Sequence, residues 1–281
     1  MVIRLLIIAL LASSIFGGAY YAVHRLYIEP EQRLVADKKL PPPTPPPDPS
    51  FEEFARCEEI RRTGTVLEAR GVFERFLKEF PESRKKDAAL DAIGEINSAE
   101  FFATKATREN TYIVRSGDAL NRVAGRLKLP VEFVVYFNKL HREILQPGQR
   151  LFAPVCNFRV VLQQKSRRVV LYNGDKYFRQ YPASTWPGAT KKPVIFLPKQ
   201  AGKVTDKIAR NDRTVVKPTD FAYFEAMHIV ATSIPGHSLY TASPTGTAQG
   251  FHPNGGGIGL APELMSEIAI LLPKGAPVTL E

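Results

Sequence analysis

The hydrophobic pattern of this chain changes its period near Asn157. Before that point, apolar residues recur at spacings of three or four, as on one face of a helix. After it, apolar and polar residues alternate over residues 158–162 and 168–178, which predicts strands, and Asn173-Gly174 favours a hairpin turn. Further strands are expected at 194–197 and 227–231, and one helix follows residue 260. The chain therefore has the pattern of an α+β multidomain protein whose last domain, residues 157–281, is mostly β.

The first 27 residues have the pattern of a membrane segment. An uncharged run from Leu5 to Val23 is long enough, as a helix rising about 1.5 Å per residue, to span a hydrocarbon layer of about 30 Å. We expect residues 1–27 to form a signal anchor or transmembrane helix. The alternative is a cleaved signal peptide, although Tyr20 and Tyr21 interrupt its cleavage site. Either interpretation exports the folded part to a bacterial cell envelope, on the periplasmic or extracytoplasmic side.

Two segments lie between this helix and residue 108. Residues 28–50 form a proline-rich linker, in which PPPTPPPDP at 41–49 favours a polyproline II spacer. Residues 51–107 have a helical pattern in which Phe80-Pro81 ends one helix and Ser83 can cap the next. This helical hairpin resembles a tetratricopeptide unit. One unit is too short for a peptide-binding solenoid, so we expect a packing or spacer role.

Residues 108–156 follow the order strand, helix, helix, strand. The first strand begins at Thr111, the helices lie near residues 120–127 and 130–138, and the second strand comes after Pro147-Gly148. This βααβ segment resembles a LysM module, a family that binds N-acetylglucosamine-containing glycans. The residues that carry the resemblance are Tyr112, Val114, Gly117, Asp118, Leu120, Val123, Ala124, Asn138, Leu140, Leu145, Gly148, Gln149 and Leu151.

The LysM resemblance implies a glycan site in the two loops that flank the helices. Its expected residues are Gly117, Asp118, Ala119, Leu120, Leu145, Gln146, Pro147 and Gly148. The family usually has threonine where this chain has Ala119, so one hydroxyl near the sugar is missing. The alternative is a βααβ spacer whose groove binds nothing.

A glycine-rich turn, residues 254–260, precedes the last helical pattern and a short final strand. This end of the chain resembles the L,D-transpeptidase catalytic domain, whose turn reads approximately Ser-His-Gly-Cys-Ile-Arg-Leu. Here Gly257 stands at the position of the nucleophilic cysteine, Gly255 at that of the histidine and Gly259 at that of the arginine. The upstream histidine of the family corresponds to Tyr240. The resemblance therefore implies a transpeptidase frame without its catalytic residues.

No other residue type replaces the missing nucleophile at the expected place. Cys57 and Cys156 belong to earlier segments, and Ser238 and Ser243 do not sit at a strand-to-helix turn. His237 or His252 could supply a base if the alignment shifts. We expect a pseudoenzyme, with neither a metal nor another cofactor, because no Cys/His cluster is present.

The formal charge of +10 lies mostly between residues 157 and 220. Its cations, which include Lys207 and Lys217, either face acidic envelope polymers or lie on solvated strands. A nucleic-acid partner is not expected, because no nucleic-acid-binding module is present. The first interpretation is a peptidoglycan-binding envelope protein, whose partners are peptidoglycan, the inner membrane through the N-terminal helix, and other envelope proteins. The alternatives are an active L,D-transpeptidase with an unrecognised nucleophile, and an envelope scaffold without glycan affinity.

Overall fold

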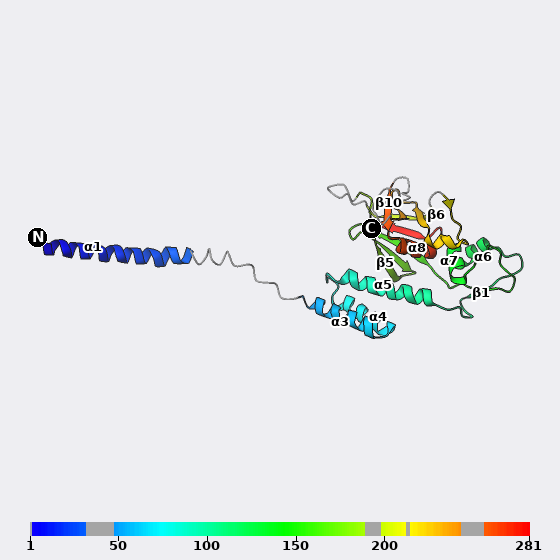
Figure 1. Ribbon diagram of the computed structural model, residues 1–281, viewed down its shortest axis with the longest axis horizontal. Coiled ribbons are helices and arrows are strands. Elements are labelled where there is room, and N and C mark those ends of the chain that lie inside the picture. The colour runs from blue at the N-terminus through cyan, green and yellow to red at the C-terminus, as the bar shows by residue number, and fades with distance from the viewer. Residues whose placement is uncertain (1, 32–47, 189–197, 212–213, 243–255) are drawn as a thin grey trace. The chain divides into compact units, whose positions relative to one another are not determined.

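The structure is a computed structural model that describes residues 2–31, 48–188, 198–211, 214–242 and 256–281 (Figure 1). The chain divides into two compact units, Met1–Pro49 and Ser50–Glu281. The prolines at 41–47 and the strand expected at 194–197 lie outside the described residues.

The first unit is helical, as expected. Helix α1 covers Val2–Val23 and continues as a π-helical turn over His24–Ile28. In the described part of the chain, no helix combines the length and the apolar character that crossing a membrane requires. The membrane anchor at residues 1–27 is therefore not confirmed.

The second unit begins with three helices that share a small core. They are α3 (Pro49–Thr63), α4 (Val66–Glu79) and α5 (Lys86–Ala103). Thr65 begins α4 with a capping box, in which its hydroxyl accepts from Glu68 N while Glu68 accepts from Thr65 N. The buried side chains between the helices are Cys57, Phe73, Phe76, Ala89, Ala92 and Ile93.

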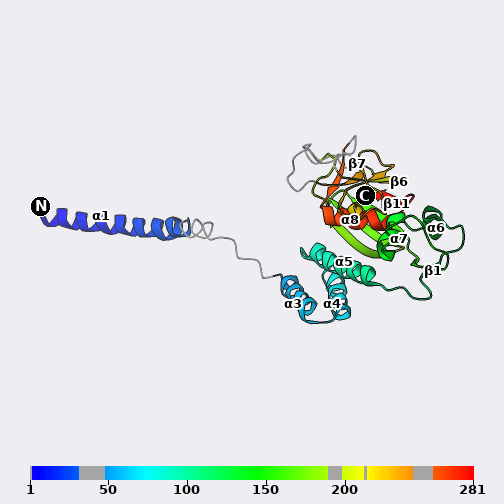
Figure 2. The same cartoon turned by 45° about the vertical axis from the view of Figure 1, so that its right-hand side comes forward.

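Helix α5 packs on the β domain, so the hairpin is not a detached spacer (Figures 1 and 2). The contact combines the ring of Phe101, which packs on Phe158 and Phe178, with a set of polar interactions. On strand β5 (Lys176–Pro182), Arg179 pairs with Glu267 of helix α8 (Pro262–Leu271) at 2.5 Å, and Ser98 of α5 donates to the same carboxylate at 2.8 Å. On strand β4, Arg168 binds Asp91 of α5 at 2.8 Å. Burial raises the pKa of Glu267 above its usual range.

The βααβ segment has the predicted element order. Strand β1 (Thr111–Ile113) pairs antiparallel with β2 (Arg150–Phe152), and helices α6 (Leu120–Leu127) and α7 (Val131–Asn138) connect them. Its buried residues, among them Val123, Phe133 and Leu151, belong to one core that continues into the β domain. This module is therefore packed against the rest of the second unit.

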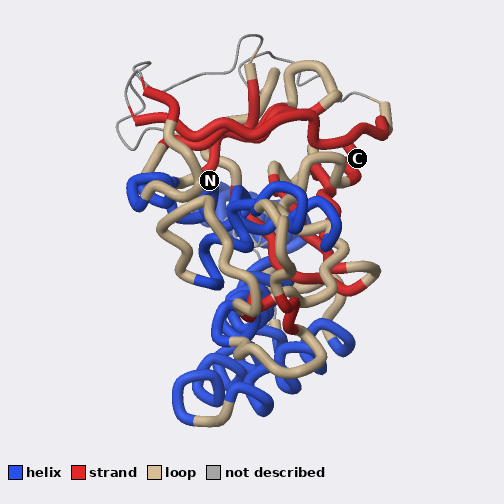
Figure 3. Tube along the Cα trace, turned by 90° about the vertical axis from the view of Figure 1, so that its right-hand side faces the viewer, coloured by secondary structure: helices blue, strands red, loops and turns tan. Residues whose placement is uncertain are grey.

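The β domain contains one sheet with the order β10-β9-β8-β6-β11-β3-β4-β5, and β7 pairs with β6. The strands are β3 (Phe158–Gln163), β4 (Arg168–Asn173), β5 (Lys176–Pro182), β6 (Gln200–Asn211), β7 (Thr214–Val215), β8 (Met227–Thr232), β9 (Ser238–Thr241), β10 (Gly257–Leu260) and β11 (Pro277–Leu280). A 3-10 helix, η2, covers Phe221–Glu225, and α8 covers Pro262–Leu271. Helix α8 packs against β8 and β9, with α7 beside it; Figure 3 shows helices gathered on one side of the strands.

Two details of the sheet differ from the sequence prediction. Asn173 pairs with Lys176, so the two turn residues are Gly174 and Asp175 rather than Asn173 and Gly174. Gly174 has a φ of +61°, which glycine adopts easily. Gly257 lies in strand β10 rather than in a turn, because parallel pairing with β9 extends the backbone up to Leu260.

Candidate functional site

The positions that match the transpeptidase motif come from two neighbouring strands. Strands β9 and β10 run parallel, and their register places Gly257 opposite Ser238 and Gly259 opposite Tyr240. The structure therefore brings together three of the four degenerate positions; Gly255 lies outside the described residues. Neither the Tyr240 side chain nor the two glycines supply a thiol or an imidazole.

Thr185 forms an antiparallel bridge with Gly259 of β10, and its side chain reaches Tyr240 of β9. Its hydroxyl lies 2.7 Å from the Tyr240 hydroxyl and accepts a hydrogen bond from Gly259 N at 3.0 Å. Ser184 N also donates to Gly259 O at 2.8 Å. Tyr240 is only 2% exposed, so its phenol is held inside the fold. We call the Thr185–Tyr240–Gly259 contact the closed centre.

The closed centre leaves no room for a side chain at position 259. A Cβ there would lie 2.5 Å from Thr185 Oγ1 and 3.1 Å from both Tyr240 Cζ and Ala242 Cβ. An arginine, which the transpeptidase motif has at this position, requires Thr185 and Tyr240 to move. Tyr240 and Gly259 are thus compatible with each other, because a side chain at position 259 would collide with the Tyr240 ring.

The remaining candidate nucleophiles and bases are not poised for catalysis where the structure describes them. Burial raises the pKa of Cys156 to about 12, and the pKa of Cys57 is also raised by burial, so both free thiols stay protonated. His237 is 3% exposed, and its Nδ1 lies 2.7 Å from Pro235 O. Ser243 and His252 lie outside the described residues.

The βααβ module brings its two expected glycan loops side by side. Val114 N donates to Gln149 O at 2.9 Å and Gly148 N donates to Val114 O at 2.8 Å, which joins the end of β1 to the loop before β2. Gly117 and Gly148 both have positive φ, +81° and +85°, and mark the turns of these loops.

The expected glycan residues divide into exposed and structural positions. Ala119, Gln146, Pro147 and Gly148 are exposed, whereas the side chains of Leu120 and Leu145 are largely buried in the core. Asp118 is used within the protein, because it accepts from Tyr112 Oη at 2.7 Å and from Arg115 N at 2.8 Å. These hydrogen bonds lower the pKa of Asp118, the bond from Arg115 N being the largest cause.

One cation of the basic stretch is buried rather than solvated, which corrects the sequence interpretation. The Lys207 side chain is 3% exposed and pairs with Glu132 of α7 at 2.9 Å. Lys207 Nζ also donates to Leu272 O at 2.9 Å, and Tyr223 Oη donates to Glu132 at 3.0 Å. Burial lowers the pKa of Lys207, and the Glu132 carboxylate opposes that shift.

The second imidazole of the described β domain, His228, lies next to this buried pair. Its ring is 4.9 Å from the ring of Tyr223, and the side chain is 2% exposed. Burial, together with the nearby Lys207 charge, lowers the pKa of His228 to about 4. His228 is therefore neutral at physiological pH. This cluster could not be recognised from the sequence, because its members are far apart in the chain.

No known protein-family profile and no curated protein sequence matches the chain. Among solved structures, an L,D-transpeptidase from Mycobacterium smegmatis is similar, with 16% identity, a TM-score of 0.30 and a match over 48% of this chain and 63% of that chain. An L,D-transpeptidase from Stackebrandtia nassauensis has 12% identity and a TM-score of 0.30, over 71% of this chain and 79% of that one. A fused Zn-dependent amidase, peptidase and peptidoglycan-binding domain protein from Clostridium acetobutylicum has 20% identity and a TM-score of 0.29, over 44% of this chain and 52% of that chain.

The matches cover less than two thirds of the Mycobacterium smegmatis and Clostridium acetobutylicum chains. The comparisons add no support for the LysM assignment, which stays a prediction.

Proposed function

We propose that this chain is a non-catalytic peptidoglycan-binding protein of the bacterial cell envelope. In this proposal the βααβ module contacts N-acetylglucosamine-containing glycan, and the β domain is an inactive relative of the L,D-transpeptidase domain. The closed centre is the observation that carries the proposal. Acyl transfer by cysteine requires a thiolate, a base and oxyanion donors. Here a buried tyrosine and two glycines occupy the corresponding strands, and Thr185 contacts both strands from a separate loop.

The glycan part of the proposal is supported by the sequence pattern and by the arrangement of the two loops. The exposed residues Ala119 and Gln146 lie on loops that backbone hydrogen bonds through Val114 hold together. The missing hydroxyl at Ala119 predicts weaker binding than in a LysM module with threonine there.

A pulldown with purified sacculi tests glycan binding. The full chain should be retained more strongly than an unrelated basic protein, and Ala119→Trp should reduce retention at least tenfold by filling the loop groove. Ala55→Trp, on the exposed face of α3, is the matched control and should bind as the unchanged protein does. Retention no greater than that of the basic protein would show that the glycan proposal is wrong and leave the scaffold alternative.

Labelling with a carbapenem probe tests the pseudoenzyme part. The intact mass of the full chain should not increase, because the described part of the β domain presents no activated thiol. An adduct would support the active-enzyme alternative, and peptide mapping would then identify the nucleophile.

The envelope location is part of the same proposal and rests on residues 1–27. We expect the protein to stay with membranes after a high-salt wash, since burial of an apolar helix does not depend on charge screening. Release by salt, or a mature N-terminus within residues 18–27, would contradict the anchor and indicate peripheral attachment or secretion.

A further inference from the structure

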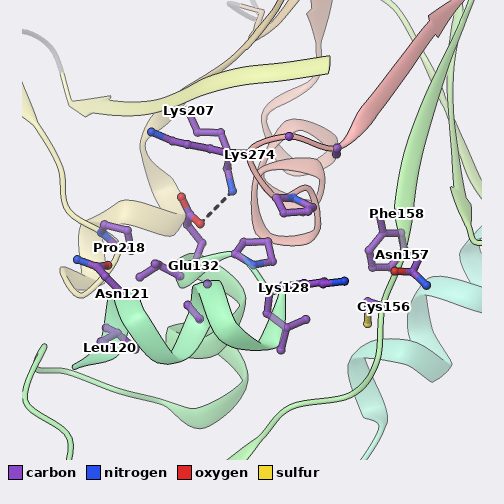
Figure 4. A pocket seen from close by; sticks show the side chains of 18 of the residues that line it. Leu120, Asn121, Lys128, Glu132, Cys156, Asn157, Phe158, Lys207, Pro218 and Lys274 are labelled. Carbon is purple, nitrogen blue, oxygen red and sulfur yellow. Dashed lines mark ion pairs between the residues drawn. The ribbon is translucent and has the colours of Figure 1, made fainter. Parts of the chain in front are cut away.

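A cleft of about 1190 Å³ lies between the βααβ module and the β domain (Figure 4). One wall comes from α6 and the start of α7, and the others come from the start of β3, the turn before β5, residues 217–219 and the connection from α8 to β11. Its size is at or above the upper end of the range for small-molecule pockets, which suits an extended ligand. None of the closed-centre residues lines this cleft.

The buried Lys207–Glu132 pair forms a rigid part of the cleft wall (Figure 4). Through its bonds to Glu132 and to Leu272 O, Lys207 connects β6, α7 and the end of α8. Because the two charges neutralise each other, this wall holds the cleft open without attracting or repelling a ligand strongly.

The other charged residues of the cleft are mainly cations. Lys128, Arg159, Lys217 and Lys274 line it, against Glu143 and Asp175. Glu143 pairs with Lys217 at 3.3 Å, and Lys274 pairs with Asp206; both ion pairs are more than half exposed. Exposed ion pairs of this kind are weak, so a carboxylate of a ligand can replace Glu143 beside Lys217 or Asp206 beside Lys274. Among the described residues, Lys128 and Arg159 have no carboxylate partner.

The position of the cations indicates the kind of anion that fits. Lys128 ends α6, Lys217 follows β7, and Lys274 lies between α8 and β11, so the charges come from three separate segments around the cleft. A single phosphate needs donors that converge on one point. Separated lysines instead suit several carboxylates along one chain, and Pro130, Pro218, Pro273 and Pro277 give apolar surface between them.

We propose that this cleft binds a short acidic peptide that carries several free carboxylates. Peptidoglycan stem peptides belong to this class, and naming them as the natural ligand rests on the proposed function. The cleft lies on the module side of the β domain. Two of the expected glycan residues, Ala119 and Leu120, also line it, so a glycan on the loops and a peptide in the cleft would lie side by side.

Binding of the sugar-free tripeptide L-Ala–γ-D-Glu–meso-diaminopimelate to the full chain tests the inference by calorimetry. Its fully amidated form is the charge control and should bind at least tenfold more weakly. The double variant Lys128→Gln with Lys274→Gln should lower the affinity for the acidic peptide at least tenfold. The matched double variant Lys78→Gln with Lys165→Gln removes the same charge from exposed sites outside the cleft, and should change the affinity less than twofold.

Equal binding by the cleft variant and the unchanged protein would overturn the inference, as would equal binding of the amidated peptide. Tighter binding of inorganic phosphate than of the peptide would also overturn it. Thermal unfolding of both double variants establishes that they fold. Sacculi carry stem peptides as well as glycan, so chitin oligomers, which carry no peptide, test the glycan loops alone. Peptide binding by a chain that binds no chitin oligomer would refute the glycan proposal alone. Binding of chitin oligomers without peptide binding would refute the cleft proposal alone.

Discussion

Gly259→Ala should destabilise the second unit, although it adds only one methyl group. The new Cβ would lie 2.5 Å from Thr185 Oγ1, closer than nonbonded atoms can approach, so Thr185 must move. Thr185 Oγ1 also contacts Tyr240 Oη at 2.7 Å and accepts from Gly259 N at 3.0 Å. Moving it weakens two hydrogen bonds of roughly 0.5–1.5 kcal/mol each and adds an overpacking cost of about 1–3 kcal/mol.

Part of this cost is offset because alanine loses less backbone entropy than glycine, by about 0.5–1 kcal/mol. The expected net loss in the free energy of unfolding is about 2 kcal/mol, which lowers the Tm by about 4–8 °C for a unit of this size. Urea and thermal unfolding measure it. Gly71→Ala is the control: nothing lies within 4 Å of a Cβ at that helical position, so it should stabilise.

A double-mutant cycle attributes the cost to the closed centre. In a Thr185→Ala background the nearest contact is absent, and Gly259→Ala should cost at least about 1 kcal/mol less than in the unchanged protein. The contacts at 3.1 Å to Tyr240 and Ala242 would account for what remains. A neutral Gly259→Ala, or the same cost in both backgrounds, would refute the packing on which the pseudoenzyme proposal rests.

Three further predictions concern the buried charges and the missing nucleophile. Glu132→Gln should lower the free energy of unfolding, measured with urea, by about 3–5 kcal/mol, because it leaves the Lys207 ammonium buried without its partner. The double variant Glu132→Leu with Lys207→Met should lower it far less, and equal losses would contradict this prediction. Because the pKa of His228 is lowered to about 4, its contribution to the free energy of unfolding is fully present above about pH 6.5 and is lost as the pH falls through about 4. The loss should reach up to about 3 kcal/mol. His228→Gln should flatten the dependence of the free energy of unfolding on pH in this range, and an unchanged curve would contradict the prediction. Gly257→Cys should neither react with a carbapenem nor exchange stem peptides, because Tyr240 supplies no imidazole to form the thiolate; rapid acylation would disprove it.

The elements with a clear period could be predicted from the sequence. The βααβ order, the helices after residue 50 and the helix near residue 262 all have apolar stripes or turn residues at the expected spacing. Strand β6 was missed, because its twelve residues carry polar side chains on exposed positions and Lys207 at a buried one. A buried lysine cannot be recognised from its own segment, since its partner Glu132 is 75 positions away in the chain.

The candidate site was predictable only in part for the same reason. The motif positions Tyr240, Gly257 and Gly259 could be aligned by spacing, and the structure places them on adjacent strands. Thr185, which contacts both Tyr240 and Gly259, lies in a loop before residue 189 with no motif of its own. Thr185 matters here only because it contacts Tyr240 and Gly259, which are more than fifty positions away in the chain. A single sequence does not show that such distant residues are close in space.

Strand β11 lies between β3 and β6, parallel to the first and antiparallel to the second. Until Pro277–Leu280 has been synthesised, β3-β4-β5 and β6-β8-β9-β10 are two separate sheets, each with an unpaired edge. The β domain therefore completes its sheet only after β11 has been synthesised and has paired on both sides. A chaperone that accompanies the folding chain would have to protect these two open edges until then, and removal of residues 277–281 would leave them open.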